Sequence, residues 1–216
     1  MKKFKLKDPF CGISHGAGAL LSLVGLALLL GVAWGKPWHL ATFAIYGVTL
    51  FLVYLASALY HSLHVSPRIE GRLLTLDRAA IFCLIAGTYT PVCLVALGGG
   101  WGWSLFGVVW GLAIVGIALD IISRRRMPDW VTALLYLVMG WIALVAIGPL
   151  ARALPLSALL LLLAGCVVYT VGAVVCVLDR PRLRPGIFGA HDLWHVLVLV
   201  ASAFHFALML RFIAPL

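Results

Sequence analysis

Two histidines stand four residues apart near the C-terminal end of the chain, in the run His191-Asp192-Leu193-Trp194-His195. In a helix this spacing places both side chains on one face, separated by about 6 Å along the axis, so both imidazoles can bind one metal ion. Structural caps and solvated helix ends show the same pairing, so the pair alone does not establish a metal site. The positions of the other polar residues decide between these interpretations.

The composition places the chain in a membrane. Of its 216 residues, 64% are hydrophobic and 11% are charged, and the mean hydropathy is +1.13. A soluble domain of this size does not need so much apolar surface, so the lipid bilayer is its solvent. Sixteen Lys and Arg oppose seven Asp and Glu. Because these basic residues lie in short turns between apolar runs, they indicate membrane topology and contact with anionic headgroups rather than nucleic-acid binding.

Seven apolar segments are each long enough to cross a hydrocarbon core of about 30 Å. Pro and Gly mark most of the connections, and no linker is long enough to separate two domains. We therefore predict an all-α integral membrane protein, a seven-transmembrane helix bundle that forms a single domain over residues 1–216. The predicted spans are 13–33, 40–62, 77–97, 102–122, 130–150, 156–178 and 191–213.

The basic residues also predict the orientation of the bundle. Twelve Lys and Arg fall on the side of the N-terminus and three on the other side, with Arg78 left uncounted just inside the third span. By the positive-inside rule, the N-terminus is cytoplasmic and the C-terminus lies outside. The apolar run after the N-terminal lysines is too long for a cleaved leader, so we expect a retained first helix.

Five cysteines, Cys11, Cys83, Cys93, Cys166 and Cys176, lie at or inside the apolar segments without a C-x-x-C pair. Membrane helices hold buried cysteine as a small hydrophobic residue. We therefore expect neither a disulfide framework nor a cysteine-based metal site.

The predicted topology brings ionisable residues from three segments to one depth. His61 lies near the cytoplasmic end of the second span, Asp77 begins the third, and His191 and His195 begin the seventh. Ionisable residues inside a membrane are energetically costly and by default indicate a functional site. Their common depth favours a metal site over solvated helix ends.

Three histidine nitrogens from His61, His191 and His195, together with one water, would complete a four-coordinate zinc ion with an open position. This arrangement is typical of catalysis. Asp77 would accept a hydrogen bond from the water as general base, or would bind the metal directly. Ser57, one helical turn before His61, could orient a ligand or donate to a developing oxyanion.

These residues resemble the hemolysin III branch of the progestin and adipoQ receptor (PAQR) family. The resemblance rests on Ser57-Ala58-Leu59-Tyr60-His61, on Asp77, on Gly87-Thr88-Tyr89-Thr90-Pro91, and on His191-Asp192-Leu193-Trp194-His195. It covers nearly the whole chain, and the ordered set is more specific than any of its parts. It implies seven helices with the N-terminus inside, and zinc near the cytoplasmic leaflet on the three histidines. Spacing alone does not select the metal, because all-histidine sites also accept iron or manganese; the resemblance favours zinc.

The resemblance also bears on activity. Adiponectin receptors and alkaline ceramidases in the wider family are associated with hydrolysis of lipid amides such as ceramide. We therefore predict a zinc-dependent hydrolase of a lipid amide or ester in the cell membrane of a bacterium, with membrane lipid as substrate. The sequence is compatible with a homo-oligomer. The alternatives are a receptor or scaffold with a structural zinc and, with less support, a pore or transporter, since polar residues at one level give no continuous hydrophilic stripe.

Among the residues outside the predicted ligand set, three histidines and one acidic residue need an interpretation. His64 could replace His61 as ligand, but it points about 60° away and toward the loop. His205 lies about 15 Å deeper than His195, too far for the same metal. His15, at the cytoplasmic end of the first span, could support a ligand. Asp120 precedes Arg124 by four residues, as in an ordinary ion pair at a helix end.

Overall fold

The computed structural model describes residues 6–123, 128–181, 183–184 and 188–216. All regular elements in these ranges are helical, with a single isolated β-bridge between Arg184 and Phe188. The elements are α1 Pro9–Val32, α2 Pro37–Ser62, α3 Pro67–Pro91, η1 Val92–Leu97, α4 Gly99–Ile122, α5 Asp129–Trp141, η2 Ile142–Ala146, α6 Ile147–Ala153, α7 Leu156–Leu178, α8 Ala190–Leu208 and η3 Met209–Ile213.

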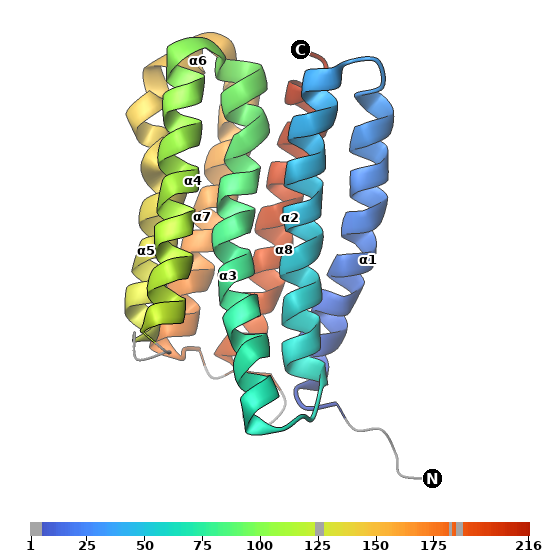
Figure 1. Ribbon diagram of the computed structural model, residues 1–216, viewed down its shortest axis with the longest axis vertical. Helices are drawn as coiled ribbons and strands as arrows, with labels where there is room; N and C mark the ends of the chain where they lie inside the picture. Colours follow the sequence, from blue (N-terminus) through green and yellow to red (C-terminus); the bar gives the residue numbers. More distant parts are fainter. Residues whose placement is uncertain (1–5, 124–127, 182, 185–187) are drawn as a thin grey trace.

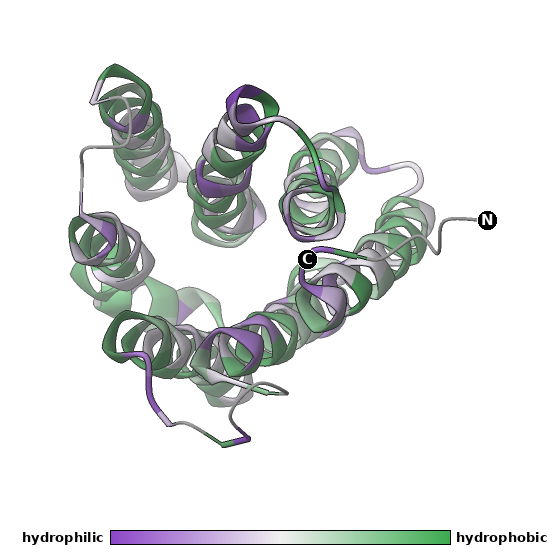
Figure 2. Cartoon of the chain, turned by 90° about the horizontal axis from the view of Figure 1, so that it is seen from below, coloured by the Kyte–Doolittle hydropathy of each residue, from purple (hydrophilic) through white to green (hydrophobic). Residues whose placement is uncertain are grey.

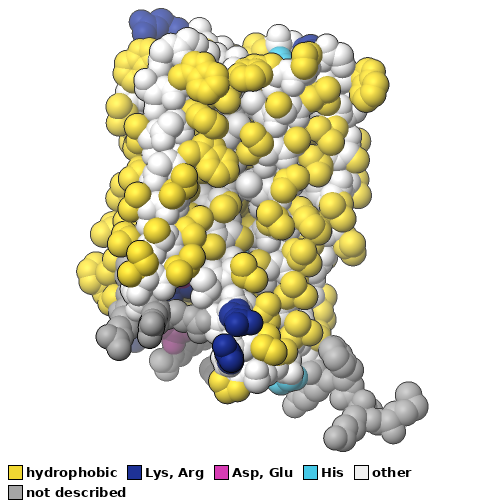
Figure 3. All heavy atoms as spheres, viewed as in Figure 1, with side chains coloured by type: hydrophobic (Ala, Val, Ile, Leu, Met, Phe, Trp, Pro, Cys, Tyr) yellow, Lys and Arg dark blue, Asp and Glu magenta, His cyan; other side chains and the backbone are white. Residues whose placement is uncertain are grey.

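Within the described ranges, these elements form seven helical spans that are long and apolar enough to cross a membrane. The predicted seven-helix class is confirmed. The start of α1 and the C-terminus lie at opposite ends of the bundle (Figure 1). Hydrophobic side chains cover the middle of the face shown in Figure 3, and Lys and Arg gather near its two ends. The direction of the bundle across the membrane stays a prediction.

The third helix begins ten residues before its predicted start. α3 starts at Pro67, a residue that favours the first turn of a helix because its missing N–H is not needed there. The first turns carry Arg68, Glu70 and Arg72, and their low hydropathy excluded them from a span predicted by apolar residues. Asp77 therefore lies three turns inside α3 rather than at its start.

The fifth span is not one regular helix. α5 gives way to the 3-10 segment η2, and α6 completes the crossing. The third and seventh spans also end in wider π-helical turns, η1 and η3. Hydropathy predicts the length of these spans, but it does not report such local changes of helical geometry.

The order of helix packing closes the bundle on itself. α1 packs on α2, α2 on α3 and α3 on α4, while α8 packs on both α7 and α1. The end-on view shows the helices with hydrophobic residues predominating along their length (Figure 2). The contact of α8 with α1 brings the last helix beside the first, and this places residues almost two hundred positions apart in one site.

A buried ion pair joins α3 to α4. The Arg78 Nη2 atom lies 2.9 Å from Oδ1 of Asp120, whose residue is only 1% exposed. Arg78 also contacts Asp129 and Thr132 of α5. The expected partner of Asp120, Arg124, lies outside the described residues. Asp120 is therefore part of a buried cross-helix network, rather than only a helix-end residue.

Candidate metal centre

Helix α8 supplies two of the candidate ligands from its first two turns. His191 is its second residue and is exposed, whereas His195 is buried one turn further in. Asp192 fixes this end of the helix, because its Oδ2 atom accepts a hydrogen bond of 2.8 Å from the backbone N–H of Gly189. An acidic residue in the first turn is also favoured by the helix dipole.

Helix α2 supplies His61, the last but one of its residues. His61 is 4% exposed, and its Nδ1 atom lies 2.9 Å from Oδ2 of Asp8. A carboxylate on Nδ1 holds the imidazole in one orientation and leaves Nε2 free to bind a metal. Asp8 was not identified from the sequence, because it precedes α1 and shares no helix with His61.

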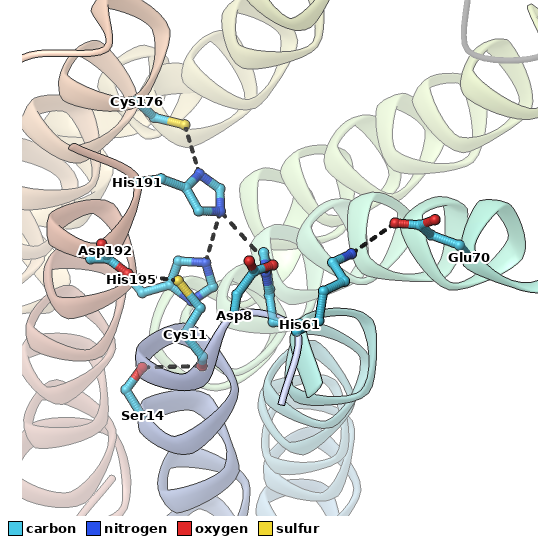
Figure 4. Close-up of polar contacts among 10 residues, drawn as sticks. Asp8, Cys11, Ser14, His61, Glu70, Cys176, His191, Asp192 and His195 are labelled. Carbon is cyan, nitrogen blue, oxygen red and sulfur yellow. Dashed lines mark hydrogen bonds and ion pairs between the residues drawn. The ribbon is translucent and has the colours of Figure 1, made fainter. Parts of the chain in front are cut away.

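The Nε2 atoms of the three histidines converge. His191 Nε2 lies 3.5 Å from that of His61 and 3.2 Å from that of His195 (Figure 4). Two nitrogen ligands at a zinc distance of about 2.0–2.1 Å and a tetrahedral angle would be about 3.3 Å apart. A hydrogen bond could join only one pair of these three nitrogens through a shared proton. A metal ion, in contrast, can accept the lone pairs of all three. The three histidines therefore fit a tetrahedral metal ion.

A fourth donor lies beside them. The donor atoms of Cys11, His61, His191 and His195 all lie within 4.8 Å of one another. This differs from the expectation that cysteine takes no part in the metal site. Cys11 is the third residue of α1, so only the packing of the first helix against the second and last ones brings it there.

Ser57 and Asp77 line the cavity into which the three histidines face. Their side chains contact each other across α2 and α3, and Asp77 is half-buried. Among the described residues, the close group of donor atoms does not include Asp77. Direct binding of the metal by Asp77 therefore has no support here. Asp77 lines the same cavity as the three histidines and contacts Ser57.

The cavity is long and mostly apolar. Its lining reaches from His191 to His205 in α8, and the space between the lining residues is about 1230 Å³ when the open solvent at its mouth is counted. At 1.5 Å per residue these two residues are about 21 Å apart along the helix axis. Most of the lining side chains are aliphatic or aromatic, as in pockets that bind apolar ligands.

The structure places three of the four other histidines in different surroundings. His64 is exposed in the connection after α2 and does not belong to the close group of donor atoms among the described residues. His205 lies at the far part of the cavity, with Nε2 3.4 Å from the Leu162 carbonyl oxygen. His15 supports the site: its Nε2 lies 3.3 Å from the His195 carbonyl oxygen, and the two rings are 4.0 Å apart.

A surface ion pair lies next to the centre. Lys7 Nζ donates a hydrogen bond of 2.9 Å to Glu70 Oε1 and sits 3.8 Å above the ring of Tyr60. Partial burial lowers the pKa of Lys7, but the hydrogen bond to Glu70 and the nearby Tyr60, Glu70 and Asp8 raise it on balance. Lys7 is therefore a fixed positive charge that ties the start of α1 to α3.

Comparison with known proteins agrees with the seven-helix membrane fold. Residues 4–206 match the family described as haemolysin-III related. Hemolysin-3 of Bacillus cereus is 39% identical over 217 residues, covering 100% of this chain and 95% of that protein. The chain belongs to the haemolysin-III family. The Hemolysin-3 homolog of Bacillus subtilis (strain 168) is 36% identical over 203 residues, covering 93% of this chain and 92% of that protein.

The haemolysin-III family belongs to the PAQR group, so the resemblance inferred from the sequence is confirmed. The bacterial relatives and the seven spans identify a multi-pass protein of the bacterial cell membrane. The region that matches the haemolysin-III family contains all the candidate ligands together with Asp8, Ser57 and Asp77.

Proposed function

We propose that this haemolysin-III protein is a zinc-dependent hydrolase that acts on an amide or ester bond of a membrane lipid. One observation carries the proposal: three histidine Nε2 atoms converge at one end of a long apolar cavity, whose wall also contains Asp77 and Ser57. Ionisable residues inside a membrane are energetically costly, and their concentration at one end of a cavity favours a functional role.

His61, His191 and His195 would hold the metal. A bound zinc ion would supply Lewis-acid polarisation of a carbonyl group and a nucleophile at neutral pH. Asp8 would keep His61 oriented through its Nδ1 atom. His191, the exposed ligand, marks the side from which water reaches the site.

Asp77 and Ser57 would carry the proton chemistry. In hydrolysis, water adds to the carbonyl carbon, the bond to the leaving nitrogen or oxygen breaks, and a proton moves from the water to the leaving group. Asp77 would take this proton and return it, because it lines the same cavity as the metal-binding histidines. Ser57, which contacts Asp77, would orient this carboxyl group or donate a hydrogen bond to the developing oxyanion.

The shape of the cavity supports a lipid substrate. Its lining runs deep into the bundle, past Tyr89 and Leu150, and offers an apolar path for a hydrocarbon chain. A lipid whose chain filled this path would present its amide or ester group at the end that carries the histidines. If the predicted orientation holds, that end lies in the cytoplasmic leaflet.

A receptor or scaffold with a structural metal is the second candidate function. The observation that favours it is Cys11, since four protein donors can close a zinc site against water. In that case, the metal would mainly join α1, α2 and α8. Replacement of Asp77 separates the two candidates, because a structural site has no need of a general base.

The test compares wild-type protein with Asp77→Asn in liposomes that contain ceramide, other acylamides and phospholipid esters. We expect the wild type to release fatty acid, and Asp77→Asn to keep its zinc and melting temperature while turnover falls about 100-fold or more. Asp129→Asn, the same carboxylate-to-amide change on a residue whose side chain is 96% exposed, should leave turnover unchanged. Metal-loaded wild type that hydrolyses none of these lipids would contradict the proposal.

A further inference from the structure

Cys11 occupies a position that three helices define. It is the third residue of α1 and is 2% exposed. Its Sγ atom donates a hydrogen bond of 3.2 Å to Oδ1 of Asp192 in α8 (Figure 4). The same sulfur lies within 4.8 Å of the donor nitrogens of His61 in α2 and of both α8 histidines.

Backbone contacts hold Cys11 in this position. Just before α1, the N–H of Asp8 donates a 2.7 Å hydrogen bond to the carbonyl oxygen of His61, so the chain is fixed to the end of α2 three residues before the cysteine. Gly12, the residue after Cys11, has no side chain, and a Cβ atom there would collide with Oγ of Ser62. The close approach of α1 to the end of α2 therefore depends on the sequence around Cys11.

We propose that Cys11 is the fourth protein ligand of the metal. This inference rests on the metal site of the proposed function and adds to it. Three histidines and one thiolate are all preferred zinc ligands, and together they complete a four-coordinate set. At zinc distances of about 2.3 Å for sulfur and 2.1 Å for nitrogen, the sulfur would be about 3.6 Å from each nitrogen. Since the donors now lie within 4.8 Å, a movement of about 1 Å completes the set.

The Cys11 thiol can bind the metal or donate its hydrogen to Asp192, but it cannot do both at once. Coordination replaces the S–H bond by a sulfur–metal bond and releases the proton to water. When the thiol instead donates its hydrogen to Asp192, as in this structure, the fourth position is left for water or substrate. Cys11 therefore closes the site in one arrangement and opens it in the other.

Cobalt(II) reports the presence of sulfur directly, because a thiolate ligand adds an intense charge-transfer band in the near ultraviolet. The full-length protein in detergent is loaded with cobalt as wild type, Cys11→Ser and Cys176→Ser. Cys176 is the matched control, since its sulfur lies 3.8 Å from Nδ1 of His191 but outside the group of converging donors. We expect the band in the wild type and in Cys176→Ser. Cys11→Ser should lose the band while it keeps about one cobalt ion per chain.

A wild type that binds cobalt without the charge-transfer band, or a band that persists in Cys11→Ser, would overturn the inference. X-ray absorption of the zinc-loaded wild type is a second measurement that needs no variant, and it should find one sulfur in the first coordination shell. A shell of nitrogen and oxygen alone would overturn the inference. Sulfur coordination without lipid hydrolysis would leave this inference standing and contradict only the proposed enzyme.

Discussion

At the scale of single residues, the site depends on the groups that orient its ligands. His61 faces its two partner histidines with Nε2 while Asp8 contacts its other ring nitrogen, Nδ1. The carboxylate of Asp8 is 47% exposed, so water can partly replace it. Its contribution to metal binding should therefore be measurable without loss of the fold.

We predict that Asp8→Asn weakens metal affinity by about 10-fold, the lower end of the range for groups that orient a metal-binding histidine. The amide keeps the shape of the side chain but removes the charge that favours the Nδ1–H tautomer of His61. Competition with a fluorescent zinc chelator measures the change. Asp129→Asn, the same substitution on a residue whose side chain is 96% exposed, is the control and should leave affinity unchanged. Equal affinities for wild type and Asp8→Asn would contradict this role.

Sequence reasoning found the residues that a helical pattern reveals and missed the others. His191 and His195 share a helical face, and His61 follows from the predicted depth of the second span. Cys11 and Asp8 join the group only through the packing of α1, and no spacing in the sequence reports that contact. Cysteine is also an ordinary residue of membrane helices, so its type alone gave no signal.

At the scale of elements, close packing of α2 against α3 brings Ser57 into contact with Asp77. Gly87 of α3 lies against Thr49 of α2, and a Cβ atom at Gly87 would collide with the Thr49 side chain. The Thr49 hydroxyl donates a 2.9 Å hydrogen bond to the carbonyl oxygen of Tyr46, which limits its freedom to move aside. This contact should therefore tolerate no added methyl group.

We predict that Gly87→Ala lowers the free energy of unfolding by about 1–3 kcal/mol, as overpacked sites usually do. The melting temperature in detergent should fall accordingly. Gly107→Ala in α4 is the control, because no described atom lies within 4 Å of a Cβ atom built there. It should leave the melting temperature unchanged or raise it slightly, since alanine favours helix. A Gly87→Ala protein as stable as the wild type would show that α2 and α3 separate easily.

Helix boundaries show a similar division between what the sequence predicts and what packing decides. Apolar length identifies every span, and Pro marks several helix starts. The polar first turns of α3 escape this criterion because they carry charges at the end of the bundle. Such turns are stabilised by partners on other elements, as Glu70 is by Lys7, and hydropathy contains no information about partners.

At the scale of the whole molecule, seven spans close into a bundle because α8 packs against α1 as well as α7. Hydropathy predicts the number of helices but not their neighbours, since nearly every face of these helices is apolar. The depth of the polar residues still predicted that helices two, three and seven would meet. The site therefore follows from topology, while the entry of the first helix into it required the structure.

The central claim is that His61, His191 and His195 bind one metal ion, and metal content tests it most directly. Mass spectrometry of metals is applied to detergent-purified wild type and to the His191→Ala, His195→Ala double variant, with melting temperatures recorded for both. We expect about one zinc ion per chain in the wild type, and none in the double variant although it remains folded. A wild type without metal after purification with added zinc, or a folded double variant that retains it, would contradict the claim.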